Sequence, residues 1–499
     1  MGGSMPAKTR AAAEPAEHFD VLIAGAGISG IGLAYHLTRQ CPDRTFLVLE
    51  AHESYGGTWL IHRYPGIRSD SDLHTFGYRF KPWSGPPIAT AAEILAYMGE
   101  VIEENALGDH IRYRHRIVHA DWSSREARWT VIAERPDGSR STFTAGFFIG
   151  ALGYYEQDKG YTPEWPGMAS FRGRIVHPQT WPEDLDFAGK RVIVIGSGAT
   201  AATLVPAIAG QTAHVTLVQR SPTYFKTGRN EIELATLLRE RSIPEAWIHE
   251  IVRRGILHEQ AKFVARAKAE PETVRDELLA DVRANLPEDY DVGRHFTPRY
   301  RPWQQRIAFV PDADLFKGIA AGKASVVTDT IERFTERGLI LSSGTEIEAD
   351  IIVTATGFNL SVLGDIPFTV DGDPVDLSQT LTYRGFMFTG LPNLVWIFGY
   401  FRASWTLRVD LLGDLICRLL NHMKAKGARA VEVAPPEGLA LKRLPWADTE
   451  DFNPNYLLRR LDRMPRRGDH PDWQHTQDYW REKDELPAID LDGPAFVYR

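Results

Sequence analysis

A chain of 499 residues exceeds what one hydrophobic core organises, so its length predicts two or more domains. Its 43% hydrophobic and 24% charged residues are typical of an ordinary globular protein, and its net charge of -8 without a dense Lys/Arg tract excludes nucleic acid as a partner, because phosphates require a basic face. Only Cys41 and Cys417 are present, too few and too far apart for a disulfide framework or a CxxC redox centre, which favours a reducing cytoplasm.

The first residues of the chain predict no export signal. Met1 to Ser4 lack an apolar stretch, and we interpret them as an added leader before a native Met5. The chain also has no apolar run of about 18 residues, so it predicts no transmembrane segment.

The first nucleotide-binding unit begins after this leader. The apolar run Phe19–Ala24 predicts a buried strand, and an Ala- and Leu-rich stretch to about Thr38 predicts a helix. Between them lies a G-x-G-x-x-G turn formed by Gly25, Gly27 and Gly30. Its glycines permit the tight turn, the approach of backbone amides to a pyrophosphate, and the packing of the helix on its strand. The unit is therefore predicted to bind a dinucleotide.

A carboxylate follows the second predicted strand. Thr45–Leu49 ends at Glu50, which can bond a ribose diol, while the helix N-terminus offers amides and partial positive charge to a pyrophosphate. An unphosphorylated ribose is favoured at this site.

The next segment, residues 56–70, combines small, aromatic and acidic residues. Paired glycines allow close approach to a ligand, two aromatic side chains can wall a flat ring, and a Tyr-Pro-Gly turn delivers an aspartate. Taken alone, it would also fit a surface turn with a buried tryptophan. The cofactor contacts predicted here are Gly57, Thr58, Trp59, Tyr64 and Asp70.

Hairpins are predicted further along the chain. Alternating residues from Trp122 to Phe148, with a turn at Pro136-Asp137-Gly138, favour antiparallel strands. Phe147–Leu152 then predicts a strand that returns to the first sheet.

A second unit repeats the pattern of the first. Lys190–Ile195 predicts a strand that leads through a glycine turn into a helix, followed by a strand from His214 to Val218. Arg220 follows this strand where the first unit has an acid, and a guanidinium can pair with a 2′-phosphate that a carboxylate would repel. A solvated surface charge is the alternative for Arg220. The predicted NADP contacts are Gly196, Ser197, Gly198, Ala199, Thr200, Arg220 and Ser221.

The two units together predict an α/β protein with two Rossmann-like dinucleotide-binding domains, FAD in the first and NADPH in the second, which can relay electrons from nicotinamide to flavin. Residues 17–154 are assigned to the first part of the FAD domain, 155–357 to the NADPH domain, and 358–499 to the second part of the FAD domain and the C-terminal tail.

Later segments complete this prediction. The segment of about residues 230–295 predicts a helical insertion in the NADPH domain, with Pro244 and Pro271 at positions typical of helix starts. Short strands are expected from Ser325 to Ala355, and an amphipathic helix from Ser404 to about Lys426. The Pro-rich tail is expected to wrap the surface.

A longer motif lies between the two glycine turns. With those turns, the chain resembles the class B flavin monooxygenases, and specifically the type I Baeyer–Villiger monooxygenases, whose fingerprint is F-x-G-x-x-x-H-x-x-x-W followed by Pro or Asp. The resemblance runs from about Phe19 to the region of Ser404 to Thr406. The fingerprint is matched by Phe171, Gly173, His177, Trp181 and Pro182. A second family signature is matched by Gly56, Gly57, Trp59, Tyr64, Pro65, Gly66 and Asp70.

Several segments resemble the ethionamide-activating subgroup of this family, which implies ketones and sulfur compounds as substrates. Many relatives have a lysine before their active-site arginine, whereas this chain, like the subgroup, has Gln305. NADPH preference is therefore expected to rest on Arg220 and Ser221. The segments are Tyr64–Asp72, Arg220–Tyr224, Asn285–Asp291 and Pro302–Arg306.

The resemblance also implies a mechanism. NADPH reduces FAD, O2 adds at the flavin C4a, and the peroxyflavin converts a ketone to an ester or lactone, or a sulfide to a sulfoxide. Arg306 matches the active-site arginine, whose charge suits a peroxide, and Asp70 matches its acidic partner; Asp72 competes for that role. A structural ion pair within the NADPH domain is the alternative for Arg306. His177 and Trp181 are expected to couple the domains rather than transfer protons.

Two other functions remain open from the sequence. An N- or S-hydroxylating flavin monooxygenase would share the glycine turns but usually lacks the terminal Trp-Pro, and a flavin-binding redox sensor would not need Arg306 and Asp70. The expected partners are a small ketone or sulfide and O2, with no metal, and the expected assembly is a monomer or weak homo-oligomer. Trp405 and Leu407 are expected either to line the substrate cavity or to lie in the core.

Overall fold

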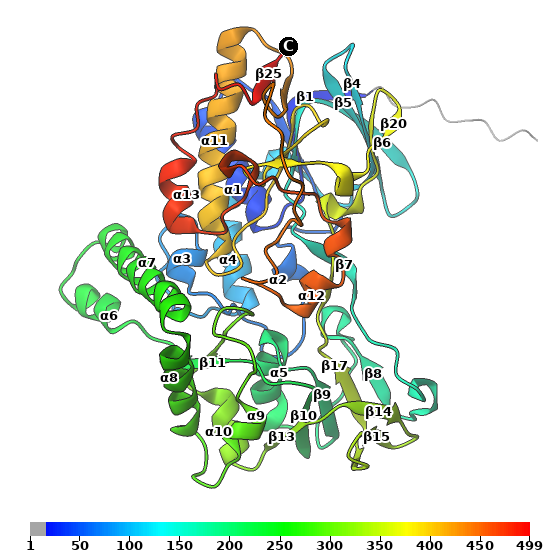
Figure 1. Cartoon of the computed structure of the whole chain (residues 1–499), viewed down its shortest axis with the longest axis vertical. Helices are drawn as coiled ribbons and strands as arrows, with labels where there is room; N and C mark the ends of the chain where they lie inside the picture. The colour runs from blue at the N-terminus through cyan, green and yellow to red at the C-terminus, as the bar shows by residue number, and fades with distance from the viewer. Residues whose placement is uncertain (1–15) are drawn as a thin grey trace, which may run out of the picture.

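Two sheets organise the computed structural model, which describes residues 16–499 (Figure 1). The added leader expected before Met5 lies outside these residues. The predicted α/β class is confirmed. In each sheet, one strand leads through a glycine turn into a helix, and the strand after that helix pairs in parallel with the first. No helix within the described range is long and apolar enough to cross a bilayer.

The first sheet has parallel strands at its centre. β1 pairs in parallel with β2 through the crossover helix α1 (Ile28–Gln40), and with β6 on its other side. β6 is one continuous strand where we predicted a hairpin arm and a separate return strand, because residues 140–145 pair antiparallel with β5, residues 143–150 pair parallel with β1, and the two pairings overlap. The strands are β1 Glu17–Ala24, β2 Phe46–Leu49, β3 Ile111–Arg112, β4 Arg116–Ser123, β5 Arg128–Glu134, β6 Arg140–Gly150, β19 Phe368–Val370, β20 Asp373–Pro374, β21 Thr382–Tyr383, β22 Met387–Phe388 and β23 Leu394–Trp396.

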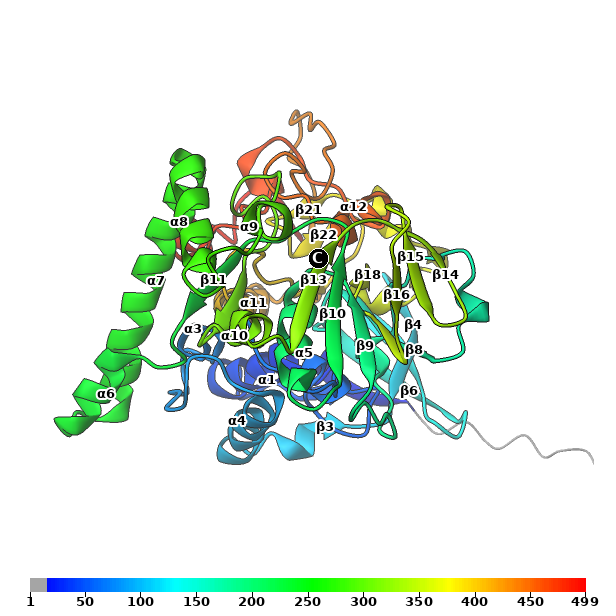
Figure 2. The same cartoon turned by 90° about the horizontal axis from the view of Figure 1, so that it is seen from below.

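The second sheet is parallel throughout, and Figure 2 shows its strands side by side. Its strand order is β13-β10-β9-β17-β8, with α5 (Ala199–Ala209) as the crossover from β9 to β10. Its strands are β8 Arg174–Val176, β9 Arg191–Ile195, β10 His214–Gln219, β13 Ala324–Thr328 and β17 Ile351–Thr354. A small antiparallel sheet beside it contains β14 Ile331–Phe334, β15 Gly338–Leu341 and β16 Glu346–Glu348.

Alternating side chains fill both faces of each sheet. In β1, Val21 and Ile23 belong to one apolar cluster, and Leu22 belongs to another on the opposite face. In β9, Val192 and Ile193 divide in the same way. The strands are therefore buried on both faces, which explains why their sequences are continuous apolar runs.

Two chain segments cross between the sheets. β7 (Tyr155–Gly160) leaves the first sheet, β18 (Phe358–Leu360) returns from the second, and the two pair antiparallel. Their register brings Phe358 opposite Gly160 and Leu360 opposite Tyr155.

The predicted helical insertion is present and protrudes to one side (Figures 1 and 2). Pro244 precedes α7 and Pro271 begins α8, as expected for helix starters. The buried Arg253 of α7 donates hydrogen bonds to the carbonyl oxygens of His74, Thr75 and Gly77, so the insertion is anchored on the C-terminal end of α3 (Leu73–Phe76). Its helices are α6 Glu233–Glu240, α7 Glu245–Ala269, α8 Pro271–Arg283 and α9 Val292–His295.

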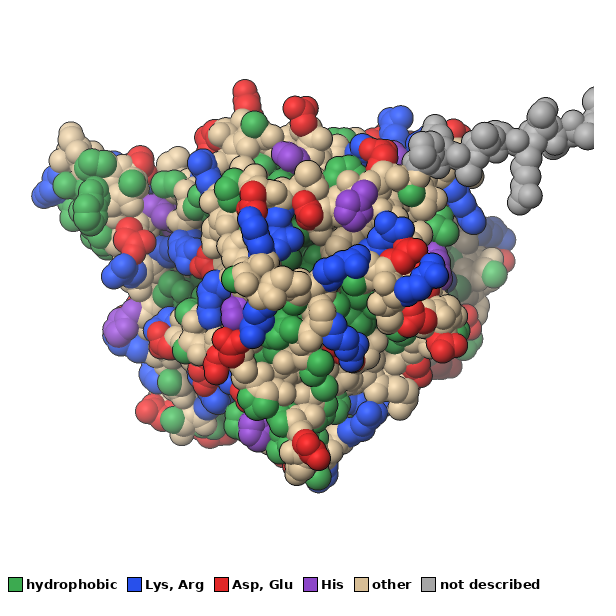
Figure 3. Space-filling view, turned by 90° about the horizontal axis from the view of Figure 1, so that it is seen from above, with side chains coloured by type: hydrophobic (Ala, Val, Ile, Leu, Met, Phe, Trp, Pro, Cys, Tyr) green, Lys and Arg blue, Asp and Glu red, His purple; other side chains and the backbone are tan. Residues whose placement is uncertain are grey.

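The predicted long helix is α11 (Trp405–Lys426), which packs against α1. The tail after it does more than wrap the surface, so that expectation was wrong. Trp446 and Trp473 are each 1% exposed, and β25 (Phe496–Tyr498) pairs with β24 (Val431–Val433). On the face in Figure 3, basic and acidic side chains are interspersed. Further elements are α2 Thr58–Ile61, α3 Leu73–Phe76, α4 Ala91–Glu104, β11 Phe225–Gly228, β12 Ala308–Pro311, α10 Asp314–Ala320, α12 Asn455–Leu458 and α13 Tyr479–Glu485.

Candidate active site between the two nucleotide-binding turns

A cavity of about 1150 Å³ lies between the glycine turns of the two sheets. Most of the residues predicted from the sequence line it, including both catalytic candidates. They are Gly25, Gly27, Glu50, Gly57, Thr58, Trp59, Tyr64, Asp70, Gly196, Ser197, Gly198, Ala199, Thr200, Arg220, Ser221 and Arg306. The other predicted residues, Gly30, Phe171, Gly173, His177 and Trp181, are outside its lining.

The first glycine turn contains positions that only glycine can occupy, because the backbone has a positive φ or packs closely against a neighbouring segment. Gly25 has φ +98°, a conformation that L side chains rarely adopt, and a Cβ added to Gly30 would lie 1.9 Å from the Gly25 carbonyl oxygen. Gly30 therefore packs the helix on its strand and does not face the cavity. Gly57 lies against Gly27, where an added Cβ would be 3.1 Å from the Gly27 Cα. The paired glycines thus bring the second segment up to the turn.

Glu50 is a buried carboxylate at the end of β2. Its Oε2 accepts a hydrogen bond from the Ala26 backbone N–H at 2.7 Å, and Oε1 accepts one from the His52 N–H at 2.8 Å. Burial opposes its ionisation, but these bonds and the His52 side chain hold its pKa below the ordinary value. Glu50 is therefore an ionised acceptor at the cavity wall, with lone pairs left for a ligand hydroxyl.

The segment after the paired glycines bridges to the second sheet. The Tyr64 side chain is 5% exposed and lies in the apolar core of the second sheet, together with Ala201 and Leu204 of α5. Gly66, at φ +76°, lies so close to α5 that an added Cβ would be 2.6 Å from the Ala207 Cβ. The Tyr-Pro-Gly turn is therefore docked on the helix that follows the second glycine turn.

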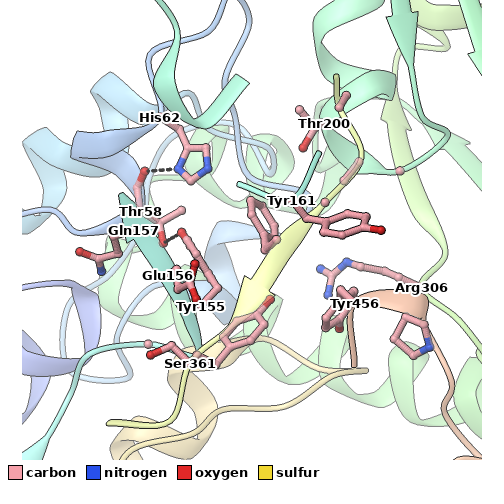
Figure 4. A pocket seen from close by; sticks show the side chains of 18 of the residues that line it. Thr58, His62, Tyr155, Glu156, Gln157, Tyr161, Thr200, Arg306, Ser361 and Tyr456 are labelled. Carbon is pink, nitrogen blue, oxygen red and sulfur yellow. Dashed lines mark hydrogen bonds between the residues drawn. The ribbon is translucent and has the colours of Figure 1, made fainter. Parts of the chain in front are cut away.

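Asp70 and Arg306 form a bidentate ion pair that faces the cavity. Arg306 Nε donates to Asp70 Oδ2 and Nη2 donates to Oδ1, each at 2.6 Å. The Arg306 side chain is 40% exposed and the Asp70 side chain is 28% exposed. One side of the guanidinium is therefore open to the cavity, as Figure 4 shows for Arg306. Burial opposes its charge, but Asp70 holds the pKa of Arg306 above its ordinary value. The site therefore contains a fixed, oriented positive charge.

The geometry separates Asp70 from its competitor Asp72. Asp72 Oδ1 accepts from the His74 backbone N–H at 2.8 Å and caps α3, and Asp72 does not line the cavity. The alternative for Arg306 was a structural ion pair within the second nucleotide-binding unit. Its ion pair is instead with Asp70, in the bridging segment (residues 58–70) that follows the paired glycines.

Aromatic side chains surround the open side of Arg306. Tyr154 stacks on Trp405 with ring centroids 5.3 Å apart, and Tyr456 lies 6.4 Å from Tyr154. Burial raises the pKa of both tyrosines, so each stays neutral near pH 7. Trp405 lines the cavity, whereas Leu407, at 1% exposure, belongs to the core. The cavity beside the charge pair is apolar and flat-walled.

Several residues that line the cavity were not predicted from the sequence, among them residues of the tail. The tail is anchored by Asp451, which pairs with Arg301 at 2.8 Å and with Arg402 at 2.6 Å. Both ion pairs connect residues distant in sequence, so no local pattern announces them. The missed residues include Tyr154, Tyr155, Tyr161, Phe401, Tyr456 and Arg459.

The second glycine turn presents the N-terminus of α5 to the cavity. Gly196 has φ +135°, and a Cβ added to it would lie 2.2 Å from the Ala355 carbonyl oxygen. The Ser197 hydroxyl bonds to the Ser221 carbonyl oxygen at 2.9 Å, which connects the turn to the residue after Arg220. Arg220 is exposed at the end of β10 and forms no ion pair within residues 16–499.

Within the fingerprint segment, His177 and Gln179 pack against the crossing strand β7 and do not line the cavity. A Cβ added to Gly160 would lie 1.9 Å from the His177 ring, and Gln179 Nε2 donates to the carbonyl oxygens of Glu156 and Gln157. Burial lowers the pKa of His177 to about 4, so the ring is neutral near pH 7. Phe171 lies in the core of the second sheet.

Comparison with known proteins gives a consistent set of relatives. A model of flavin-binding monooxygenase-like proteins matches residues 82–231, and a NAD(P)-binding Rossmann-like model matches residues 23–83. The FAD-containing monooxygenase EthA of Mycolicibacterium smegmatis is 47% identical over 470 residues, covering 93% of this chain and 94% of the relative. The putative FAD-containing monooxygenase MymA of Mycobacterium tuberculosis is 46% identical over 474 residues, covering 94% of each.

Solved structures share the fold. A steroid monooxygenase in its oxidised, NADP-bound form matches with a TM-score of 0.76 at 23% identity, over 96% of this chain and 99% of that one. A cyclohexanone monooxygenase bound to epsilon-caprolactone matches with a TM-score of 0.74 at 21% identity, over 97% and 100%.

Proposed function

The chain belongs to the family of FAD-containing monooxygenases that includes EthA and MymA, and we propose that it uses FAD, NADPH and O2 to oxygenate small ketones and sulfides. Ketones would give esters or lactones, and sulfides would give sulfoxides. The observation that carries the proposal is the Asp70–Arg306 pair, which faces a cavity that both glycine turns line.

The residues around the first turn fit FAD. The α1 N-terminus and Gly27 suit a pyrophosphate, ionised Glu50 suits an unphosphorylated ribose, and Gly57 lets its segment come close to the Gly27 backbone. We assign this site to residues 17–154 and 358–499.

The residues around the second turn fit NADPH. The α5 N-terminus suits its pyrophosphate, and Arg220 with Ser221 suits its 2′-phosphate. We assign this site to residues 155–357.

The cofactors supply the redox chemistry, in which NADPH reduces the flavin and the reduced flavin activates O2. The chain supplies charge and orientation. Arg306 keeps its proton in a partly buried site, so its N–H groups stabilise negative charge that develops on oxygen in the cavity. Asp70 holds the guanidinium plane through two bonds and balances its charge. Tyr154, Trp405 and Tyr456 form apolar walls that favour flat or aliphatic substrates and limit water.

The fingerprint has a positioning role in this proposal. His177 and Gln179 hold β7, the strand that connects the two sheets, and neither lines the cavity. A neutral, buried imidazole at this place suits domain coupling rather than proton transfer.

The FAD-loaded enzyme should be supplied with NADPH and a panel of cyclic ketones, linear ketones, aryl sulfides and tertiary amines, and the products identified by mass. Each productive substrate should gain one oxygen atom and accelerate NADPH oxidation. If amines and sulfides were oxidised but no ketone were converted to an ester or lactone, the result would favour the N- or S-hydroxylating alternative. NADPH oxidation that yields only hydrogen peroxide with every substrate would refute the proposal.

A further inference from the structure

Arg459 is a cation in the cavity wall that comes from the C-terminal tail. It directly follows α12, and its guanidinium carbon lies 3.5 Å from the centroid of the Tyr161 ring. Nη2 also donates to the Phe358 carbonyl oxygen at 3.0 Å. The stack and the hydrogen bond fix the plane of the guanidinium, so its other N–H groups have a set direction. Figure 4 shows Tyr161 on the same side of the cavity as Arg306 and Thr200.

This cation has no acidic partner in the part of the chain that the structure describes. The charged side chains that act on it are Arg460 and Arg220. Burial, together with repulsion from these two arginines, holds the pKa of Arg459 below its ordinary value. Arg460 is balanced by Glu156 at 2.7 Å, whereas Arg220 has no ion pair in residues 16–499. Two unbalanced cations near one another on the wall of one cavity favour an anion between them.

The position of Arg459 indicates which anion this is. An atom of its guanidinium lies 3.7 Å from where a Cβ on Gly357 would be, and Gly357 follows the Ala355 carbonyl that contacts Gly196. Arg459 therefore lies beside the segment that packs on the second glycine turn and lines the same cavity as that turn, where helix N-terminal amides would meet a pyrophosphate. Arg220 is at the end of β10, where a ribose phosphate is expected.

We propose that Arg459 binds the pyrophosphate of the nicotinamide dinucleotide, which makes the C-terminal tail part of the NADPH site. The inference rests on the proposed function, because it takes the second turn as the NADPH site. Arg459 would add a charge-assisted hydrogen bond to those of the α5 amides. It would also connect occupancy of this site to the tail that carries Tyr456 beside Arg306.

Equilibrium binding to the oxidised, FAD-containing enzyme, measured by isothermal titration calorimetry, tests the inference without turnover. Arg459→Gln should raise the Kd of NADP+ and of NAD+ by similar factors of about ten, because the pyrophosphate is common to both. Arg220→Ala should raise the Kd of NADP+ but not that of NAD+. An unchanged Kd for both nucleotides in Arg459→Gln overturns the inference, and so does a loss confined to NADP+, which would place Arg459 at the 2′-phosphate.

Arg463→Gln is the matched control, because Arg463 is exposed in the same tail and does not line the cavity. It removes the same charge and should leave both Kd values unchanged; a tenfold loss there would attribute the effect to net charge and overturn the inference. If Arg459→Gln fails to fold, Arg459→Met keeps the aliphatic stem over Tyr161 and carries the same expectation. Failure of the proposed function looks different, since wild type would then bind NADP+ no better than NAD+ and Arg220→Ala would change nothing.

Discussion

Exchange of Asp70 for asparagine tests the charge pair with a nearly isosteric change. Asp70 accepts two hydrogen bonds from Arg306, each at 2.6 Å. An amide keeps one acceptor oxygen but turns an NH2 donor toward the second arginine N–H, so one of the two bonds is lost. A hydrogen bond to a charged group contributes about 1.5–3 kcal/mol. Because the two side chains are 40% and 28% exposed, we take the lower limit, which predicts a roughly tenfold fall in kcat.

The assay follows product formation by mass together with NADPH consumption at saturating cofactor. Asp70→Asn should lower the product rate about tenfold, while NADP+ still binds, since the second turn is untouched. Asp72→Asn is the control, because it removes the same charge two residues away and asparagine also caps a helix N-terminus well. A wild-type product rate in Asp70→Asn, or an equal loss in Asp72→Asn, would refute the role we give to the pair.

Three further predictions concern selectivity, docking and pH. Arg220→Ala should reduce the preference of kcat/KM for NADPH over NADH by about tenfold or more, and an unchanged preference would remove Arg220 from the 2′-phosphate site. Gly66→Ala should lower the free energy of unfolding, measured by urea denaturation, by about 2–4 kcal/mol, because Gly66 has a φ of +76° and lies against Ala207. Gly138→Ala is the control, since Gly138 has a φ of +78° but lies in open space, and it should lower the same free energy by only about 1 kcal/mol. Burial lowers the pKa of His177 to about 4, so the folded chain binds fewer protons there than the unfolded chain; its contribution to stability is complete above about pH 6.5 and is lost as the pH falls toward 4. The melting temperature of His177→Gln should therefore fall less steeply than that of wild type from pH 6.5 to 4.5, and equal slopes would contradict this.

Local signals explain why both nucleotide units could be predicted from the sequence. A buried parallel strand is a continuous apolar run, and the turn after it needs glycine where φ is positive or the backbone comes close. Gly25 and Gly196 meet both conditions in the structure, at φ +98° and +135°. These requirements act within a few residues, so the pattern is readable without knowing the rest of the fold.

The choice between Asp70 and Asp72 could not be made in the same way. Both lie in one short acidic stretch, and either could cap a helix. What separates them is a contact with Arg306, which is more than two hundred residues away and whose position depends on the second sheet. The tail residues Tyr456 and Arg459 were missed for a related reason, because ion pairs of Asp451 with distant arginines place them.

The docking of the bridging segment determines how the charge pair is supported. Although Asp70 follows the first glycine turn in sequence, its segment contacts the second sheet through Tyr64, which lies in the core of that sheet, and through Arg68, which pairs with Asp314 at 2.6 Å. Arg306 lies two residues before β12, which pairs with β11 beside the same sheet. Arg306 Nη1 also donates to the Phe401 carbonyl oxygen at 3.4 Å, and the Ser69 backbone N–H donates to the Ala89 carbonyl oxygen at 2.9 Å, so the charge pair is held between the segments of both sheets.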